Sequence, residues 1–180
     1  MFKVLSEPLP GVYILSNPCF TDERGIFFKT FNYTLFKDLD IEFTPREQFS
    51  TISSKNVLRG MHFQVQESSH NKLVSCNSGS ILDVIVDVRT SSPYYNMPFS
   101  IELSGKSNQL VFIGKGYAHG FLSLEEDTLV SYTTDKEYNQ SLDSGVHWSS
   151  INYHWPVERP LVSTRDQMHP DIGEQKCEFF

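Results

Sequence analysis

The chain has 180 residues, of which 39% are hydrophobic and 13% aromatic, and its formal net charge at pH 7 is −7. This length predicts a single domain over residues 1–180, because domains usually contain about 100–200 residues. The negative charge argues against a nucleic-acid partner and an anionic membrane surface, since both require a basic field. A small anionic ligand is compatible with this charge because it needs only a few local cations.

The cysteines indicate a reducing compartment. Cys19, Cys76 and Cys177 form no C-x-x-C motif, and three cysteines cannot all pair. A chain without a disulfide framework is typical of the cytoplasm. The segment from Met1 to Gly11 has no basic region followed by an apolar one, and no stretch approaches the roughly 18 apolar residues of a membrane span. We therefore expect a cytoplasmic protein.

Short strand patterns recur along the chain, separated by Gly, Pro, Asn and Ser, and the many aromatic residues suit a pleated surface. The one helix expected near the start follows Asn32, whose side chain can cap Tyr33–Leu39. Residues after Trp155 are expected to lie over the strands as an extension. The pattern predicts an all-β sandwich or barrel with short peripheral helices. The predicted strands are Gly11–Ser16, Gly25–Phe31, Glu47–Ser53, Val57–Gln64, Lys72–Cys76, Ile81–Arg89, Phe99–Leu103, Gln109–Ile113 and Thr128–Thr134.

The clearest strand, Ile81–Arg89, alternates between two faces. One face carries Leu82, Val84, Val86 and Val88, and the other carries Ile81, Asp83, Ile85, Asp87 and Arg89. The two carboxylates either line a cavity or lie on an outer face beside neighbouring cations. The sequence does not choose between these alternatives, and we assign neither aspartate to a site.

Two of the six histidines lie in glycine-containing motifs, Arg59-Gly60-Met61-His62 and Gly116-Tyr117-Ala118-His119. The second motif, with Gly114 before it, is similar to one half of the metal site of metal-binding cupins. The other half of that metal site is absent, because His62 is followed by Phe63 and Gln64 and not by a second histidine and a glutamate. Two nitrogen ligands are too few for an open metal site, which typically needs three. We therefore predict no metal and no other cofactor.

Without a metal, the remaining side chains suit proton transfer. His62 can act as a base, and Tyr132 and Tyr138 offer phenols. A C–H bond beside a carbonyl becomes removable when a base faces the proton and a cation or donor faces the developing enolate oxygen. The residues therefore favour enolate chemistry.

Four motifs identify a known family. They are Asp22-Glu23-Arg24-Gly25-Ile26-Phe27, Val57-Leu58-Arg59-Gly60-Met61-His62-Phe63-Gln64, Lys72-Leu73-Val74 continuing to Asp87-Val88-Arg89, and Tyr117-Ala118-His119-Gly120-Phe121. With them, the chain resembles the dTDP-4-dehydrorhamnose 3,5-epimerase family over nearly its full length. Later segments agree in order, including Glu137-Tyr138-Asn139 and Ser163-Thr164-Arg165-Asp166.

The resemblance implies a cupin-like jelly-roll barrel that forms a homodimer, with a loop of the partner closing over the nucleotide. It also implies epimerisation of a nucleoside-diphosphate 4-keto-6-deoxyhexose at carbon 3, carbon 5 or both. A sugar 3,4-ketoisomerase on the same barrel is an alternative, and its product would be a 3-keto sugar. A carbohydrate-binding barrel without activity is a second alternative, although it would have little use for Asp166 behind His62.

The resemblance also implies residue roles. His62 matches the general base, Asp166 the carboxylate that holds its tautomer, and Tyr132 the opposing proton donor. Lys72 matches a lysine that stabilises the enolate oxygen or a phosphate. The implied substrate contacts are Arg24 and Arg59 at the diphosphate, Phe27 beside Arg24 in the first motif, His119 at the substrate, Tyr138 at the base, and Asp143 and Arg165 where the family tends to have Glu and Lys.

Three positions that match nucleotide or sugar contacts depart from the family pattern. Lys29 replaces a glutamate, and Glu47 and Phe49 replace a glutamine and an asparagine. One interpretation is a neutral, compensating exchange between Lys29 and Glu47. The other is an altered specificity, because the change at positions 47 and 49 removes amide donors and a shift of about 1 Å at the reacting carbon can cost roughly a hundredfold in rate. We predict inversion at carbon 3 and leave carbon 5 open.

Overall fold

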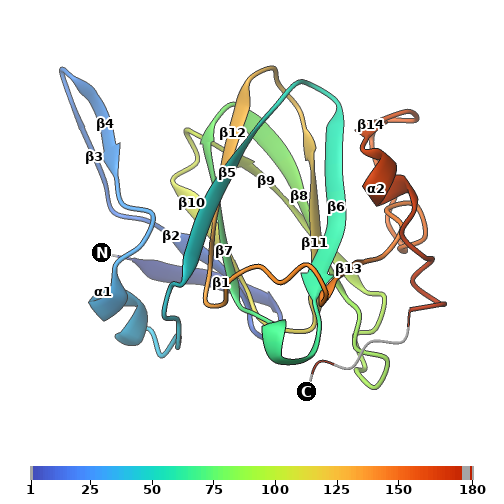
Figure 1. Ribbon diagram of the computed structural model, residues 1–180. Helices are drawn as coiled ribbons and strands as arrows, with labels where there is room; N and C mark the ends of the chain where they lie inside the picture. The colour runs from blue at the N-terminus through green and yellow to red at the C-terminus, as the bar shows by residue number, and fades with distance from the viewer. Residues whose placement is uncertain (1, 176–178, 180) are drawn as a thin grey trace.

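Two β-sheets that face each other form the body of the molecule, of which the computed structural model describes residues 2–175 and 179 (Figure 1). The first sheet has the order β1 (Lys3–Leu9), β2 (Val12–Ser16), β10 (Gln109–Ile113), β7 (Lys72–Ser78), β12 (Thr128–Thr134) and β5 (Glu47–Ser53). The second has the order β13 (Asp143–Gly145), β6 (Val57–Gln64), β11 (Tyr117–Ser123), β8 (Ser80–Asp87) and β9 (Pro98–Ser104), with β14 (Leu161–Val162) beside β6. The predicted all-β jelly-roll architecture is confirmed.

The remaining elements are peripheral. A hairpin of β3 (Cys19–Asp22) and β4 (Gly25–Phe28) projects from the body of the molecule, and the helices are α1 (Tyr33–Lys37), the 3-10 turn η1 (Gln66–Ser68) and α2 (Thr164–Gln167) (Figure 1). Asn32 caps α1 as expected, because its side-chain oxygen accepts a hydrogen bond of 3.0 Å from the amide of Leu35. Within the described residues, every helix is too short or too polar to cross a bilayer.

Four of the predicted strands have the observed bounds, namely β5, β6, β10 and β12. The sequence reading missed β1, because the polar and proline-containing segment Ser6-Glu7-Pro8 hides it. Proline is tolerated there because β1 lies at the edge of its sheet. The predicted strands also lack β11, which carries His119.

Buried side chains form three clusters. The one around Leu15, Phe36 and Leu73 packs α1 against the outer face of the first sheet, and the other two are layers that bear on the site. One lies between the sheets and includes Val74, Ile81, Ile85, Val111, Val130 and Tyr132. The other lies on the outer face of the second sheet and includes Leu58, Val84, Val86, Trp155 and Ile172. The segment after Trp155 therefore covers the second sheet, as the sequence predicts, and α2 lies outside β6 (Figure 1).

This layering decides between the two interpretations of the aspartates on β8. Asp83 and Asp87 share a face with Ile81 and Ile85, which belong to the layer between the sheets, and both carboxylates are fully buried. The interpretation of an outer face is therefore wrong. Asp87 pairs with Arg89 at 2.6 Å, whereas Asp83 reaches the site described below.

The cysteines contribute no cross-link in the part of the chain that the structure describes. Cys19 is half-buried and Cys76 is buried, and both are free thiols. Cys177 lies outside the described residues.

Candidate active site

A cavity of about 300 Å³ opens between the two sheets. This volume is at the lower end of the range of roughly 300–1,000 Å³ that is typical of small-molecule sites. Eleven residues singled out from the sequence line it: Glu47, Phe49, Arg59, His62, Lys72, His119, Tyr132, Tyr138, Asp143, Arg165 and Asp166. Sequence reasoning did not assign Thr51, Phe63, Gln64, His70, Phe121, Thr134 and Ser163, which also line it. The alternation of β12 could have found Thr134, two residues after Tyr132.

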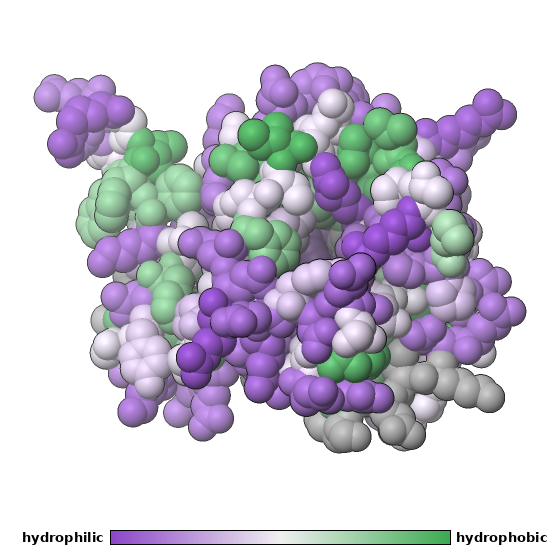
Figure 2. All heavy atoms as spheres, viewed as in Figure 1, coloured by the Kyte–Doolittle hydropathy of each residue, from purple (hydrophilic) through white to green (hydrophobic). Residues whose placement is uncertain are grey.

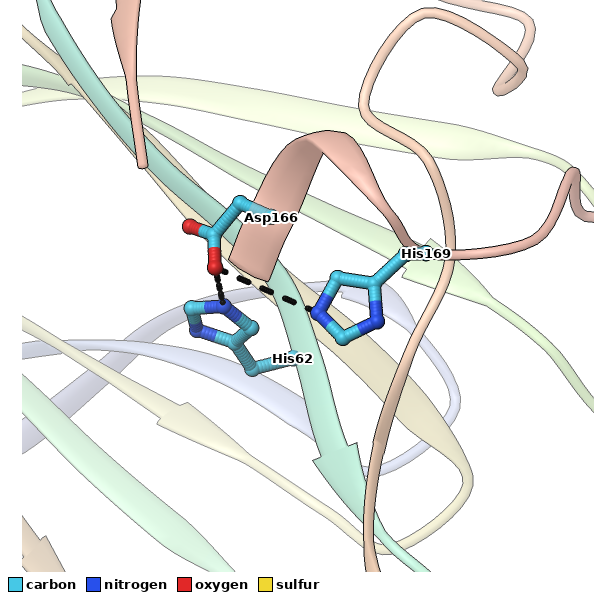
Figure 3. Close-up of side chains that lie close together, drawn as sticks. All are labelled: His62, Asp166 and His169. Carbon is cyan, nitrogen blue, oxygen red and sulfur yellow. Dashed lines mark hydrogen bonds and ion pairs between the residues drawn. The ribbon is translucent and has the colours of Figure 1, made fainter. Parts of the chain in front are cut away.

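His62 and Asp166 meet across a sequence separation of 104 residues. His62 Nε2 lies 2.9 Å from Asp166 Oδ1 (Figure 3), and the other carboxylate oxygen accepts a hydrogen bond of 3.0 Å from the amide of Gly60. Burial alone would raise the pKa of Asp166, but the hydrogen bonds from His62 and Gly60 outweigh it and lower the pKa to about 2. The carboxylate is therefore ionised at neutral pH and holds the imidazole in one orientation.

Gly60 allows β6 and β11 to approach each other. Its φ is +139°, and a Cβ at this position would lie 2.6 Å from the Cα of Gly120. Only glycine fits such a contact without a shift of the backbone. The register of the two strands places His62 opposite His119, so both histidine motifs meet at one point of the sheet.

His119 is bonded to an aspartate that the sequence reading left out of the site. Its Nε2 lies 2.7 Å from Asp83 Oδ1, and both side chains are buried. Burial lowers the pKa of His119 although Asp83 opposes this shift, so the imidazole is neutral at pH 7. The position of Asp83 between Ile81 and Ile85 on one strand face was the available signal.

Tyr132 faces the cavity from the sheet opposite to His62, because it belongs to β12 and His62 to β6. Its ring is 6% exposed, and burial raises its pKa, so the phenol is protonated at neutral pH. Phe49 is its direct cross-strand neighbour on β5, and the two rings stack with centroids 4.8 Å apart at 16°. The phenol therefore has a restricted orientation.

Two cations approach the cavity from its walls. Lys72 starts β7 beside Thr134 of β12, and burial lowers its pKa to about 8 although Asp83 and Asp143 oppose this shift. Arg59 is held in place by a hydrogen bond of 3.0 Å from its Nε to Ser53 Oγ. The cavity thus combines an ionised carboxylate, imidazoles, a phenol and cations.

A cluster of hydrogen-bonded polar residues lies at the rim of the cavity. Asp143 Oδ2 pairs with Arg165 and accepts a hydrogen bond of 3.3 Å from the hydroxyl of Tyr138. Glu47 Oε2 accepts a hydrogen bond of 2.7 Å from the amide of Tyr138. Glu47 therefore positions the rim within its own chain, and among the described residues it forms no ion pair with Lys29, so the exchange between these two positions is not compensated inside one chain.

Three predicted contacts lie away from the cavity. Arg24 and Phe27 belong to the projecting hairpin, and Lys29 follows it. The Arg24 side chain is 86% exposed and pairs with Asp22 at 2.6 Å. Figure 2 shows apolar side chains on this hairpin below a hydrophilic tip. Within a single chain, the structure does not bring these three residues together with the others.

The positions of a cupin metal site are engaged in hydrogen bonds. Gln64 accepts a bond of 2.7 Å from the amide of Asn139, and His119 is bonded to Asp83. These side chains do not fit a metal ion at the usual cupin position.

Residues 6–174 match the family model of dTDP-4-dehydrorhamnose 3,5-epimerase. The chain belongs to this family. It is 36% identical over 169 residues to the dTDP-4-dehydrorhamnose 3,5-epimerase of Shigella flexneri, an alignment that covers 91% of this chain and 92% of the relative. The match confirms the resemblance, and as a member of the family the protein is an isomerase of the sugar-epimerase type.

Solved structures agree in fold. The dTDP-6-deoxy-D-glucose-3,5-epimerase of Legionella pneumophila Philadelphia 1, in complex with dTDP-4-keto-L-rhamnose, has a TM-score of 0.94 at 26% identity, covering 100% of this chain and 99% of that one. A 3'-monoepimerase from Streptomyces bikiniensis, in complex with dTDP-quinovose, has a TM-score of 0.84 at 25% identity, covering 91% and 84%. The barrel is therefore the cupin-like fold of these epimerases.

Proposed function

We propose that the protein epimerises a thymidine-diphosphate-linked 4-keto-6-deoxyglucose by proton transfer through an enolate. The observation that carries this proposal is the placement of His62 and Tyr132 on opposite sheets around one cavity, with Asp166 bonded to His62. The names of the Shigella and Legionella relatives, and the dTDP-4-keto-L-rhamnose in the Legionella complex, support the substrate class.

The proposed reaction starts at a carbon beside the keto group. The free ring nitrogen of His62 takes the proton from one face of this carbon, and the C–H electron pair moves onto the keto oxygen as an enolate. Lys72 stabilises the oxygen by its positive charge. The Tyr132 hydroxyl then gives its proton to the opposite face, which inverts the carbon. Exchange with solvent removes the proton from His62 and returns one to Tyr132.

Phe49 supports inversion at carbon 3 and a reduced action at carbon 5. The same donor must reach both carbons for full 3,5-epimerisation, but the stack of Phe49 on Tyr132 restricts the phenol. An asparagine, which the family resemblance leads us to expect at position 49, would leave this ring face free. The Streptomyces bikiniensis relative, named a 3'-monoepimerase, supports the view that this fold accommodates single inversion.

Turnover in deuterated water tests whether the protein is an epimerase and how many carbons it inverts. Each inverted carbon takes one deuteron from solvent, so mass spectrometry of the recovered sugar nucleotide counts the inverted positions. One deuteron, located at carbon 3 by NMR, identifies a 3-epimerase, and two identify a 3,5-epimerase. Phe49→Asn is expected to raise the share of doubly labelled product. Absence of label would rule out both epimerases, and a 3-keto product would identify the ketoisomerase alternative.

We also propose that the protein is a homodimer in which the hairpin completes the partner's site. Its exposed apolar side chains, Phe20, Ile26 and Phe27, are 65%, 51% and 59% exposed in the single chain. Burial of such side chains against a second copy would be favourable, and it would carry Arg24 and Lys29 to a new position.

Complementation tests this arrangement. Arg24→Ala and His62→Asn are each expected to be inactive alone, and a refolded mixture should recover part of the activity because one site of each heterodimer contains neither change. Light scattering measures the mass of the same samples. A monomeric protein, or a mixture without recovery, would contradict the proposal.

A further inference from the structure

A second imidazole lies behind the His62–Asp166 pair. His169 Nε2 is 4.0 Å from Asp166 Oδ1, the same oxygen that is bonded to His62, and the two imidazole rings are 5.7 Å apart (Figure 3). The His169 side chain is only 12% exposed. Its Nε2 is buried and has no hydrogen-bond partner among the described residues. A buried ring nitrogen without a partner is costly, so its position calls for a ligand.

The fold leaves a space shaped for this imidazole. Gly145 of β13 pairs with His62 of β6 in the sheet register. A Cβ at Gly145 would lie 2.5 Å from His169 Nε2 and 2.6 Å from the backbone oxygen of Met61. The end of α2 brings His169 to this space three residues after Asp166. The ring is therefore held beside the carboxylate by packing.

We propose that His62, Asp166 and His169 form a binding site for a divalent transition-metal ion, with Zn²⁺ as the best fit, and that the bound ion switches off the base. Two imidazoles and a carboxylate are the ligand set of an open zinc site, with a fourth position for water. One ligand atom of each residue lies within 4.8 Å of the others. Tetrahedral zinc bonds of about 2.0–2.2 Å place ligand atoms roughly 3.3–3.6 Å apart, so shifts of about 1 Å or less close the site around an ion.

The inhibition rests on the proposed role of His62, whereas the binding does not. When the metal takes Nε2, the proton on this nitrogen goes to solvent and Nδ1 takes up a proton from solvent. The neutral ring then carries its only proton on Nδ1, which points away from His169 (Figure 3). This nitrogen no longer has a lone pair free to accept a proton from the substrate. The site is distinct from the cupin position, because two of its three ligands come from the C-terminal segment.

Binding is tested on the tag-free full-length protein. Titration with Co²⁺ should give the visible absorption of a four-coordinate ion, and equilibrium dialysis should give one Zn²⁺ per chain. His169→Leu is expected to weaken binding roughly tenfold to a hundredfold or more, since loss of a ligand costs at least as much as loss of a supporting contact. His169→Cys keeps a zinc ligand and should retain binding. His154→Leu removes an exposed histidine and should change nothing.

Activity separates this proposal from the proposed function. Zn²⁺ should inhibit the wild type reversibly, with recovery after chelation, and His169→Leu should keep its metal-free activity while losing the inhibition. A wild type that binds no stoichiometric metal, or a His169→Leu variant that binds it equally well, overturns the metal site. Stoichiometric binding by a protein without epimerase activity would support the metal site and contradict the proposed function.

Discussion

Two histidine–aspartate pairs lie side by side in this barrel and differ in their access to the cavity. In the pair His62–Asp166, the imidazole is 27% exposed, whereas in the pair His119–Asp83 it is 4% exposed. His62 and His119 are register partners on β6 and β11. The two imidazoles therefore have nearly equivalent positions in the sheet, and they differ in exposure because their surroundings differ.

The origin of each carboxylate explains that difference. Asp83 lies on β8, the strand hydrogen-bonded to β11, so the sheet itself holds it against His119. Asp166 lies on α2, within the segment that covers the outer face of the second sheet. In the buried pair, the neutral imidazole of His119 is suited to a substrate contact and not to proton exchange. The accessible pair can exchange protons with substrate and solvent, which is what a general base needs.

The largest expected effect is at the accessible imidazole. His62→Asn should lower kcat by about 10²–10⁴-fold, because general-base catalysis contributes on this scale. Thermal unfolding should be nearly unchanged, since the side chain is partly exposed. Deuterium incorporation by the purified variant measures the effect. Near-normal incorporation would end the assignment of His62 as the base.

Asp166→Asn should have the next largest effect, a loss of about tenfold to a hundredfold, because partners that orient a functional side chain contribute on this scale. It should also change acid stability. The pKa of Asp166 is lowered from 3.8 to about 2, so its contribution to the free energy of unfolding is present above pH 4 and lost as the pH falls toward 2. Acid titrations of both proteins measure this. Equal activity of the variant would place the orienting group elsewhere.

Lys72 should produce an alkaline limb in the rate profile. Its pKa is lowered to about 8, so the ammonium that stabilises the enolate is present below this pH and is lost above it. We expect kcat to fall by about tenfold per pH unit above pH 8, toward the activity of the uncharged form. Lys72→Arg stays charged and should move this limb to higher pH. A limb that stays at the same pH in the variant would belong to another group.

Loss of the buried partner should act mainly on stability. Asp83→Leu leaves the ring N–H of His119 without an acceptor, which costs about 1–3 kcal/mol in the free energy of unfolding. Activity per folded molecule should fall by less than in Asp166→Asn. Denaturant unfolding together with kinetics measures both quantities. A variant of normal stability but without activity would reverse the roles of the two pairs.

Removal of metals should have the smallest effect. The cupin ligand positions Gln64 and His119 are bonded to Asn139 and Asp83, so we expect full activity after exhaustive chelation. Activity that disappears on chelation and returns with zinc, iron or nickel would contradict the prediction. The expected inhibition by added Zn²⁺ at His169 is compatible with it.

The sequence by itself determined the strand pattern and the motif residues, because alternation and glycine placement are local properties. It predicted β5, β6, β10 and β12 to the residue, and it selected His62, Tyr132 and Asp166 through the family motifs. All three line one cavity. It could also predict that β8 has two distinct faces.

Only the tertiary structure decided which face of β8 points inward, because alternation separates two faces without saying what covers each. The covering segment lies far along the chain, and its position placed Asp83 inside the barrel and His169 beside Asp166. The sequence also could not locate Arg24. The family motif assigns this residue to the site, but in the structure it lies on the projecting hairpin, away from the cavity. Contacts between distant segments depend on packing, and packing is a property of the whole fold.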